Sequence, residues 1–118
     1  KDSVDLSDTI KQTANIAAFV QAMHTGNFDL LSRSLQDHVI EKQRSKLIPG
    51  FDEAKAISLD KGVLGFGISG SGPTMFALSD NENIARDTAD AVRKYYEQEN
   101  VDSTTIVSLV NHDGTVLC

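Results

Sequence analysis

Residues 63–78 constrain the fold of this chain more than any other segment. Over residues 63–69, bulky apolar side chains alternate with small ones, which predicts a strand with one bulky and one smooth face. The turn-forming run Gly70-Ser71-Gly72-Pro73 follows, and residues 74–78 form a second short apolar run. Together the two runs predict a β-hairpin, and another element can approach its smooth face closely.

Helical spacing of apolar residues predicts four helices around this hairpin. The first is expected over about residues 7–24, where Ile16, Phe19, Val20 and Met23 share a face, and Gly26 ends it. The second is expected to start after Asn27 and to end before residues 47–50, since Pro49-Gly50 breaks a helix. The third covers residues 51–61 and ends at Gly62, and the fourth covers roughly 82–98.

Two more strands are expected after the last helix. The β-branched run at 104–107 leads into residues 109–110 and predicts a third strand. Asp113-Gly114 is a hairpin-turn signal, so residues 115–117 are expected to form a short fourth strand. The fold class is therefore α+β, with about four antiparallel strands in one layer and helices in the other. We expect a single domain over residues 1–118.

Composition excludes several classes of partner. The net charge of −6 disfavours nucleic acid, which is bound through clustered Lys and Arg. No apolar run approaches the roughly 18 residues needed to span a bilayer, so no membrane partner is expected. The single cysteine, Cys118, can form no disulfide within the chain and indicates a reducing compartment, with the cytoplasm as the expected location. No His, Cys or carboxylate group has the spacing of a zinc site, so no metal is expected.

The glycine-rich segment resembles two nucleotide-binding motifs but fits neither. Residues 65–70 match G-x-G-x-x-G, but the first two glycines lie inside a strand and no helix follows. A P-loop needs a lysine, and none occurs between Lys61 and Lys94. Two interpretations of Ser69-Gly70-Ser71-Gly72 remain. The segment forms a tight hairpin turn, or it exposes a run of backbone N–H groups that bind an anion such as phosphate or carboxylate.

Two side chains upstream are candidates for binding a small ligand. Arg44 can hold a planar carboxylate through two parallel N–H groups, or it is a solvated arginine beside Glu41. His38 lies at the edge of an apolar stripe, where it can reach a ligand, cap a helix or face water. The residues alone leave these alternatives open.

Residues 67–78, Gly-Ile-Ser-Gly-Ser-Gly-Pro-Thr-Met-Phe-Ala-Leu, resemble the third, glycine-rich motif of the GHMP small-molecule kinases. The version Gly-Ile-Ser-Gly-Ser-Gly-Pro is typical of the homoserine kinase branch. Residues 37–44, Asp-His-Val-Ile-Glu-Lys-Gln-Arg, followed by Leu-Ile-Pro-Gly-Phe, are similar to the segment that precedes this motif in that branch. The resemblance covers nearly the whole chain in order.

The resemblance implies a ferredoxin-like C-terminal domain of a kinase that transfers the γ-phosphate of ATP to L-homoserine on the route to threonine. It places Arg44 and His38 in the substrate site and the loop residues Gly67, Ser69, Gly70, Ser71 and Gly72 beside the phosphates. ATP and Mg²⁺ would be held mainly by an N-terminal domain that this chain lacks. No catalytic residue is then expected in these 118 residues, and the isolated domain is expected to be inactive.

Two alternatives come from other classes of protein. One is a stand-alone ligand-binding or regulatory module of ferredoxin-like build that binds a small anion at Ser69-Gly70-Ser71-Gly72. The other is a structural domain that pairs with a second copy of itself. The sequence does not decide whether the chain forms a homodimer.

Overall fold

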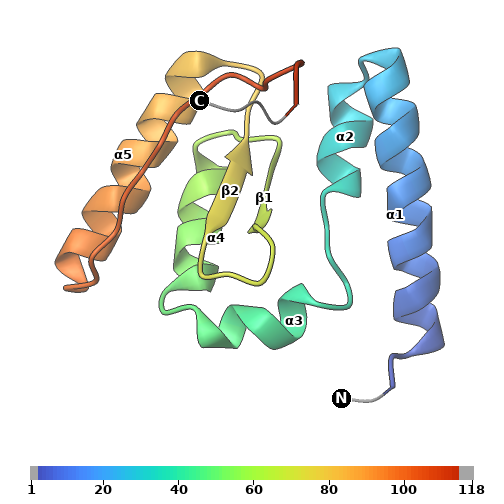
Figure 1. Cartoon of the computed structure of the whole chain (residues 1–118), viewed down its shortest axis with the longest axis horizontal. Helices are drawn as coiled ribbons and strands as arrows, with labels where there is room; N and C mark the ends of the chain where they lie inside the picture. The colour runs from blue at the N-terminus through green and yellow to red at the C-terminus, as the bar shows by residue number, and fades with distance from the viewer. Residues whose placement is uncertain (1–2, 115–118) are drawn as a thin grey trace.

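The computed structural model describes residues 3–114 and shows an α+β chain. In chain order its elements are α1 (Leu6–Thr25), α2 (Phe28–Ser34), α3 (Glu41–Arg44), the 3₁₀ helix η1 (Ser45–Leu47), α4 (Phe51–Asp60), β1 (Gly65–Ile68), β2 (Met75–Leu78) and α5 (Glu82–Gln98). Helix α4 packs behind the two strands with α5 beside it, whereas α1 and α2 form a separate pair on the other side of the hairpin (Figure 1).

The predicted hairpin is confirmed. Strands β1 and β2 pair antiparallel, with Gly65 opposite Leu78 and Ile68 opposite Met75. The smooth face of β1 receives the end of α2, because a Cβ atom built on Gly65 would lie 2.5 Å from Cδ1 of Leu35. The absence of a side chain at this position lets the segment after α2 pack directly on the strand.

The hydrophobic core lies between the hairpin, α4 and α5. Its buried members are Ile48, Phe51, Ala54, Phe66 and Tyr96. The rings of Phe51 and Phe66 are 5.5 Å apart between centroids in a tilted arrangement, a favourable geometry for aromatic pairs. The core therefore joins the helix after residue 50 to the strand that leads into the glycine-rich turn.

The first and last helices agree closely with the sequence prediction. The Asp5 side chain accepts a hydrogen bond from the Ser7 N–H at 2.8 Å and so caps α1, and Gly26 ends that helix with φ of +65°. The Asn81 side chain caps α5 in the same way.

The predicted apolar face of α1, however, is not covered by other described residues, with Ile16 and Met23 each 60% exposed. No helix within residues 3–114 is long and apolar enough to cross a membrane.

The prediction of one continuous second helix is wrong. Helix α2 ends at Ser34, and α3 begins only at Glu41. Between them, Oδ1 of Asp37 accepts hydrogen bonds from the N–H groups of Val39 and Ile40, both at 2.8 Å. In a continuous helix those N–H groups would bond to backbone carbonyls four residues earlier. The aspartate replaces these carbonyls and starts a new turn.

The prediction of a third strand at residues 104–110 is also wrong for this chain. These residues belong to no strand, and the described part of the chain contains one two-stranded sheet. No backbone hydrogen bond joins residues 102–110 to any other described residue. Strand propensity alone cannot form a ladder, because a strand needs an adjacent edge with which to pair. The predicted fourth strand at 115–117 lies outside the described residues.

Tyr96 gives a test of the core. Its hydroxyl donates a hydrogen bond to the carbonyl oxygen of Pro49 at 3.0 Å, and burial raises its pKa above the ordinary value. We expect Tyr96→Phe to lower the free energy of unfolding by about 1 kcal/mol near neutral pH. Because the folded-state pKa is raised, the wild type should lose stability as the pH rises above about 10, the value for an unperturbed tyrosine.

Urea unfolding of both proteins between pH 7 and pH 11 would check this. The wild type should lose part of its advantage over Tyr96→Phe at the alkaline end. A constant difference between the two proteins across this range would contradict the assignment to Tyr96.

Candidate functional site

Arg44 and the glycine-rich turn, 27 residues apart in sequence, meet in the structure. Nη1 of Arg44 donates a hydrogen bond to the carbonyl oxygen of Ser71 at 2.9 Å. Arg44 lies at the end of α3, is exposed, and forms no ion pair with any other described residue. A cationic group therefore lies beside the turn, and its remaining N–H groups can bind an anion.

The turn itself leaves backbone N–H groups free. It is closed by hydrogen bonds from Ser69 N–H to Thr74 O, at 2.8 Å, and from Gly72 N–H to Ser69 O, at 3.2 Å. The N–H groups of Gly70 and Ser71 donate no hydrogen bond to another described residue. Together with the Ser69 and Ser71 hydroxyls, they form a set of donors suited to an anion.

Both glycines of this turn are needed for its backbone conformation. Gly70 and Gly72 have φ values of +62° and +79°, in the left-handed region that favours glycine. A side chain at Gly72 would also contact Ile48, because a Cβ atom built on Gly72 lies 3.0 Å from Cδ1 of Ile48. At Gly70 no atom lies within 4 Å of the built Cβ, so its surface is open. The turn is thus held on the core side and accessible on the other.

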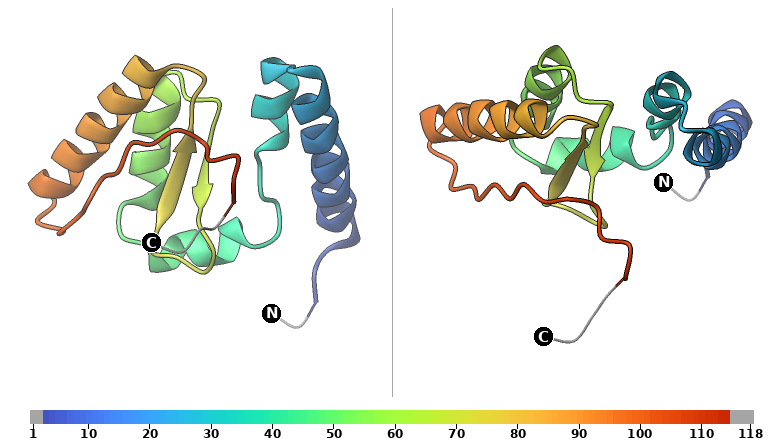
Figure 2. Two further views of the ribbon diagram at one scale, coloured as in Figure 1. Left: turned by 45° about the horizontal axis from the view of Figure 1, so that its top comes forward. Right: turned by 90° about the horizontal axis from the view of Figure 1, so that it is seen from above.

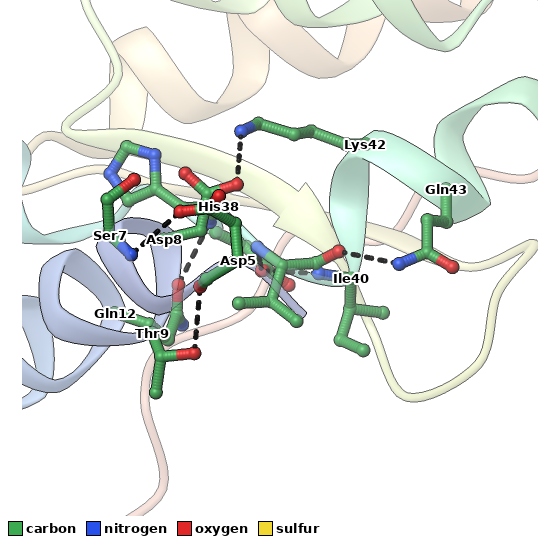
Figure 3. A network of polar contacts seen from close by, with 11 residues as sticks. Asp5, Ser7, Asp8, Thr9, Gln12, His38, Ile40, Lys42 and Gln43 are labelled. Atoms are coloured by element: carbon green, nitrogen blue, oxygen red, sulfur yellow. Dashed lines mark hydrogen bonds and ion pairs between the residues drawn. The ribbon is translucent and has the colours of Figure 1, made fainter. Parts of the chain in front are cut away.

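Two ion pairs hold α3, and with it Arg44. Glu41 pairs with Lys55 of α4, and Nζ of Lys42 lies 2.9 Å from Oδ2 of Asp8 in α1 (Figure 3). The Glu41–Lys55 pair is the better shielded, with side chains 15% and 28% exposed. Sequence reasoning missed both pairs, because the partners are 14 and 34 residues apart and no local pattern connects them.

His38 lies in a different environment from Arg44. Its backbone N–H donates to Oε1 of Gln12 at 2.9 Å, within a polar network between the start of α1 and α3 (Figure 3). In the same network, hydrogen bonds from Ser7 lower the pKa of Asp5 below its ordinary value. No hydrogen bond among residues 3–114 joins His38 to Arg44 or to the turn. The structure therefore joins the arginine to the loop by a hydrogen bond and shows no such bond from His38 to either of them among the described residues.

Gly67 serves a different purpose from the turn glycines. It is buried in β1, and a Cβ built on it would lie 3.1 Å from the ring of Phe76 and 3.8 Å from Oε2 of Glu41. This position borders a small cavity of about 230 Å³ that Gln12, Leu35 and Glu41 also line. Gly67 lies two residues before the turn, and its lack of a side chain makes room for the elements packed on β1.

The donor set does not fit a divalent metal. No group of three His, Cys, Asp or Glu side chains gathers anywhere in the described part of the chain. Mg²⁺ is usually held by carboxylates together with phosphate oxygens. The residues at the turn supply a guanidinium and N–H donors instead. This site therefore suits an anion such as phosphate and not the Mg²⁺ ion that accompanies it.

Comparison with known proteins assigns the family. The model that describes the C-terminal region of GHMP kinases matches residues 17–98, a span that contains both Arg44 and the glycine-rich turn. The chain belongs to the GHMP kinase family. Its structure is thus that of a GHMP kinase C-terminal region, in which helices accompany an antiparallel hairpin.

Several homoserine kinases are among the GHMP kinases to which this chain is similar. The chain is 37% identical over 113 residues to the homoserine kinase of Chlorobium phaeovibrioides, covering 94% of this chain and 35% of that protein. It is 43% identical over 90 residues to the homoserine kinase of Chlorobaculum tepidum, covering 76% of this chain and 26% of the relative. A crystal structure of homoserine kinase from Cytophaga hutchinsonii superposes with a TM-score of 0.91 at 40% identity, over 94% of this chain and 35% of that one. The chain thus spans about a third of the length of these relatives.

Proposed function

We propose that this chain is the C-terminal domain of an ATP-dependent homoserine kinase that acts in the cytoplasm. The observation that carries the proposal is the contact of Arg44 with the carbonyl oxygen of Ser71. It places a guanidinium beside a turn whose Gly70 and Ser71 N–H groups donate to no other described residue. The relatives at 37% and 43% identity are named homoserine kinases, which supports L-homoserine as the acceptor of the phosphoryl group and ATP as its donor.

The reaction requires two anions to be held close together. Homoserine has a carboxylate, and its hydroxyl oxygen forms a new bond to the γ-phosphorus of ATP while the bond from that phosphorus to ADP breaks. The hydroxyl proton leaves in the same reaction. Arg44 suits the carboxylate, since a guanidinium can donate two parallel hydrogen bonds to it. The N–H groups of Gly70 and Ser71 suit the phosphate region, and positioning of this kind accounts for much of the catalysis in phosphoryl transfer.

The remaining parts of such a site belong to an N-terminal domain in this proposal. Mg²⁺, when bound with ATP, would neutralise charge on the phosphates, and no group of three His, Cys, Asp or Glu side chains gathers among the described residues to hold it. The length of the relatives leaves room for this domain, because the chain matches only 35% of the homoserine kinase from Chlorobium phaeovibrioides. His38 stays a candidate for substrate contact in this proposal.

The proposal is tested by comparing the full-length protein with the 118-residue chain. We expect the full-length protein to release ADP from ATP only when L-homoserine is present, and to form phosphohomoserine. The 118-residue chain should show no turnover above background, because in this proposal the N-terminal domain holds ATP and the magnesium ion.

L-Serine, which is shorter by one methylene, is a suitable control acceptor. Equal rates with serine and homoserine would argue against the proposed specificity. Turnover by the isolated chain would overturn the need for a second domain, and failure of the full-length protein with homoserine would overturn the proposed function itself.

A further inference from the structure

Helix α3, which carries Arg44, is too short to fix its own position. It has four residues, none of them buried, and its N-cap residue makes no side-chain hydrogen bond. Isolated helices of this length are not stable in water. In Figure 2, α3 lies between α4 and the pair formed by α1 and α2. The contacts that its side chains make with neighbouring elements therefore decide which groups Arg44 can reach.

Glu41 and Arg44 are three residues apart in this helix. Residues at this spacing are neighbours on the surface of a helix, and an acidic and a basic side chain there can form an ion pair. Such a pair would occupy N–H groups of the Arg44 guanidinium and neutralise its charge. It would then compete with the carboxylate that Arg44 is proposed to bind.

Among the described residues, Glu41 pairs with Lys55 and not with Arg44. The ammonium group of Lys55 binds Oε1 of Glu41 and lies 5.9 Å from the ring centroid of Phe51, a buried core residue of α4. Lys55 is thus anchored on a helix that belongs to the core. The guanidinium of Arg44 donates instead to the carbonyl oxygen of Ser71. The lysine therefore holds the one carboxylate that is spaced to neutralise Arg44 within α3.

Glu41 is shielded enough to need a positive partner. Its side chain is 15% exposed, and its Oε2 atom lies close to the smooth face of β1. Removing one partner of a shielded ion pair leaves the other charge uncompensated, which is unfavourable. The other basic residue of α3, Lys42, is paired with Asp8 of α1. Without the ammonium of Lys55, the spacing of α3 makes Arg44 the available partner for Glu41.

We propose that Lys55 is a positioning residue of the kinase, which binds Glu41 and so keeps the guanidinium of Arg44 available for the carboxylate of homoserine. Lys55 acts through Glu41 and does not itself touch the substrate. The inference rests on the proposed function, and it adds to that function a residue from a different helix. It also gives the ion pair between α3 and α4 a role in substrate affinity besides its role in the fold.

A double-mutant cycle in the full-length protein tests this role. We expect Lys55→Met to raise the KM for homoserine about three- to tenfold, a part of the loss that follows removal of a hydrogen bond to a charged group. The KM for ATP should change much less. In a protein that already carries Glu41→Gln, adding Lys55→Met should cause no further rise, because a neutral amide cannot neutralise Arg44.

Three further variants serve as controls. Lys55→Arg keeps the positive charge and should keep the KM for homoserine near that of the wild type. Lys61→Met makes the same change at an exposed lysine at the end of α4, which forms no ion pair with any described residue, and should alter neither KM value. Urea unfolding of each variant separates a loss of stability from a change in KM, and Lys55→Gln replaces Lys55→Met if that variant does not fold.

The outcomes separate this inference from the proposed function. An equal rise in the KM for homoserine with and without Glu41→Gln would show that Lys55 only supports the fold, and would overturn the inference. No rise in either background would also overturn it, as would an equal rise in the KM for ATP. In these cases homoserine is still phosphorylated, so the proposed function stands. If the unmodified full-length protein showed no turnover with homoserine, the proposed function and this inference would both be overturned.

Discussion

Replacing Arg44 by alanine in the full-length protein should raise the KM for homoserine about ten- to hundredfold. The estimate follows from losing one contact between a guanidinium and a carboxylate, which contributes about 1.5–3 kcal/mol in total. Arg44 forms no ion pair with the described residues, so the carboxylate of the substrate is its proposed counter-charge. The KM for ATP should change much less. Steady-state kinetics with each substrate varied in turn would measure both values.

The contact of Arg44 with Ser71 makes the comparison of the two KM values necessary. Loss of the 2.9 Å hydrogen bond to Ser71 O can also disturb the turn. An equal rise in the KM for ATP and for homoserine would contradict the carboxylate role and would favour a purely structural contact. Lys46, an exposed basic residue in η1, gives the matched control: Lys46→Ala changes the net charge equally but should leave both KM values unchanged. Arg44→Lys should recover only part of the loss, since an ammonium cannot form the bidentate contact.

Replacing Gly65 by alanine should lower the free energy of unfolding by about 1–3 kcal/mol, the range for overpacking a well-packed interior. The new Cβ would lie 2.5 Å from Cδ1 and 2.7 Å from Cβ of Leu35. Since the Cβ of Leu35 is fixed to its backbone, rotation of the side chain cannot relieve both contacts. The segment that leads to α3 must therefore move away from β1. Thermal or urea unfolding would measure the loss.

Gly67 provides a control on the same face of β1. A Cβ at Gly67 would lie 3.1 Å from the ring of Phe76, which is 42% exposed and can turn away. Gly67→Ala should therefore lower stability less than Gly65→Ala does. If the two variants lost the same stability, the close packing of Leu35 on β1 would not be the cause. Because α3 follows Leu35, Gly65→Ala should also weaken the contact of Arg44 with the turn and raise the KM for homoserine.

Several elements could be predicted because short-range patterns determine them. The hairpin follows from the alternation of bulky and small residues before Gly70, and α5 follows from its helical spacing. The single second helix was wrong because one side chain, Asp37, competes with the backbone for the N–H groups of Val39 and Ile40. Such competition depends on where the side chain points, and apolar spacing carries no information about it.

In the candidate site, too, some features could be predicted from the sequence and others could not. Sequence alone determined the turn, because glycine at Gly70 and Gly72 permits the positive φ values that the structure shows. Sequence also identified Arg44 as a residue of interest. Only the tertiary structure decided that Arg44 touches Ser71, that Glu41 and Lys55 hold α3 in place, and that the N–H of His38 bonds to Gln12. These contacts join segments far apart in the chain.

The strand prediction for residues 104–110 shows the physical reason most clearly. The β-branched residues there were identified correctly as strand-forming in composition, yet the described chain offers them no edge to pair with. Strand and helix propensity and turn chemistry depend on residues only a few positions apart, so they can be predicted directly from the sequence. Pairing, ion pairs and close packing depend on which distant segments the fold brings together, so the tertiary structure alone decided them.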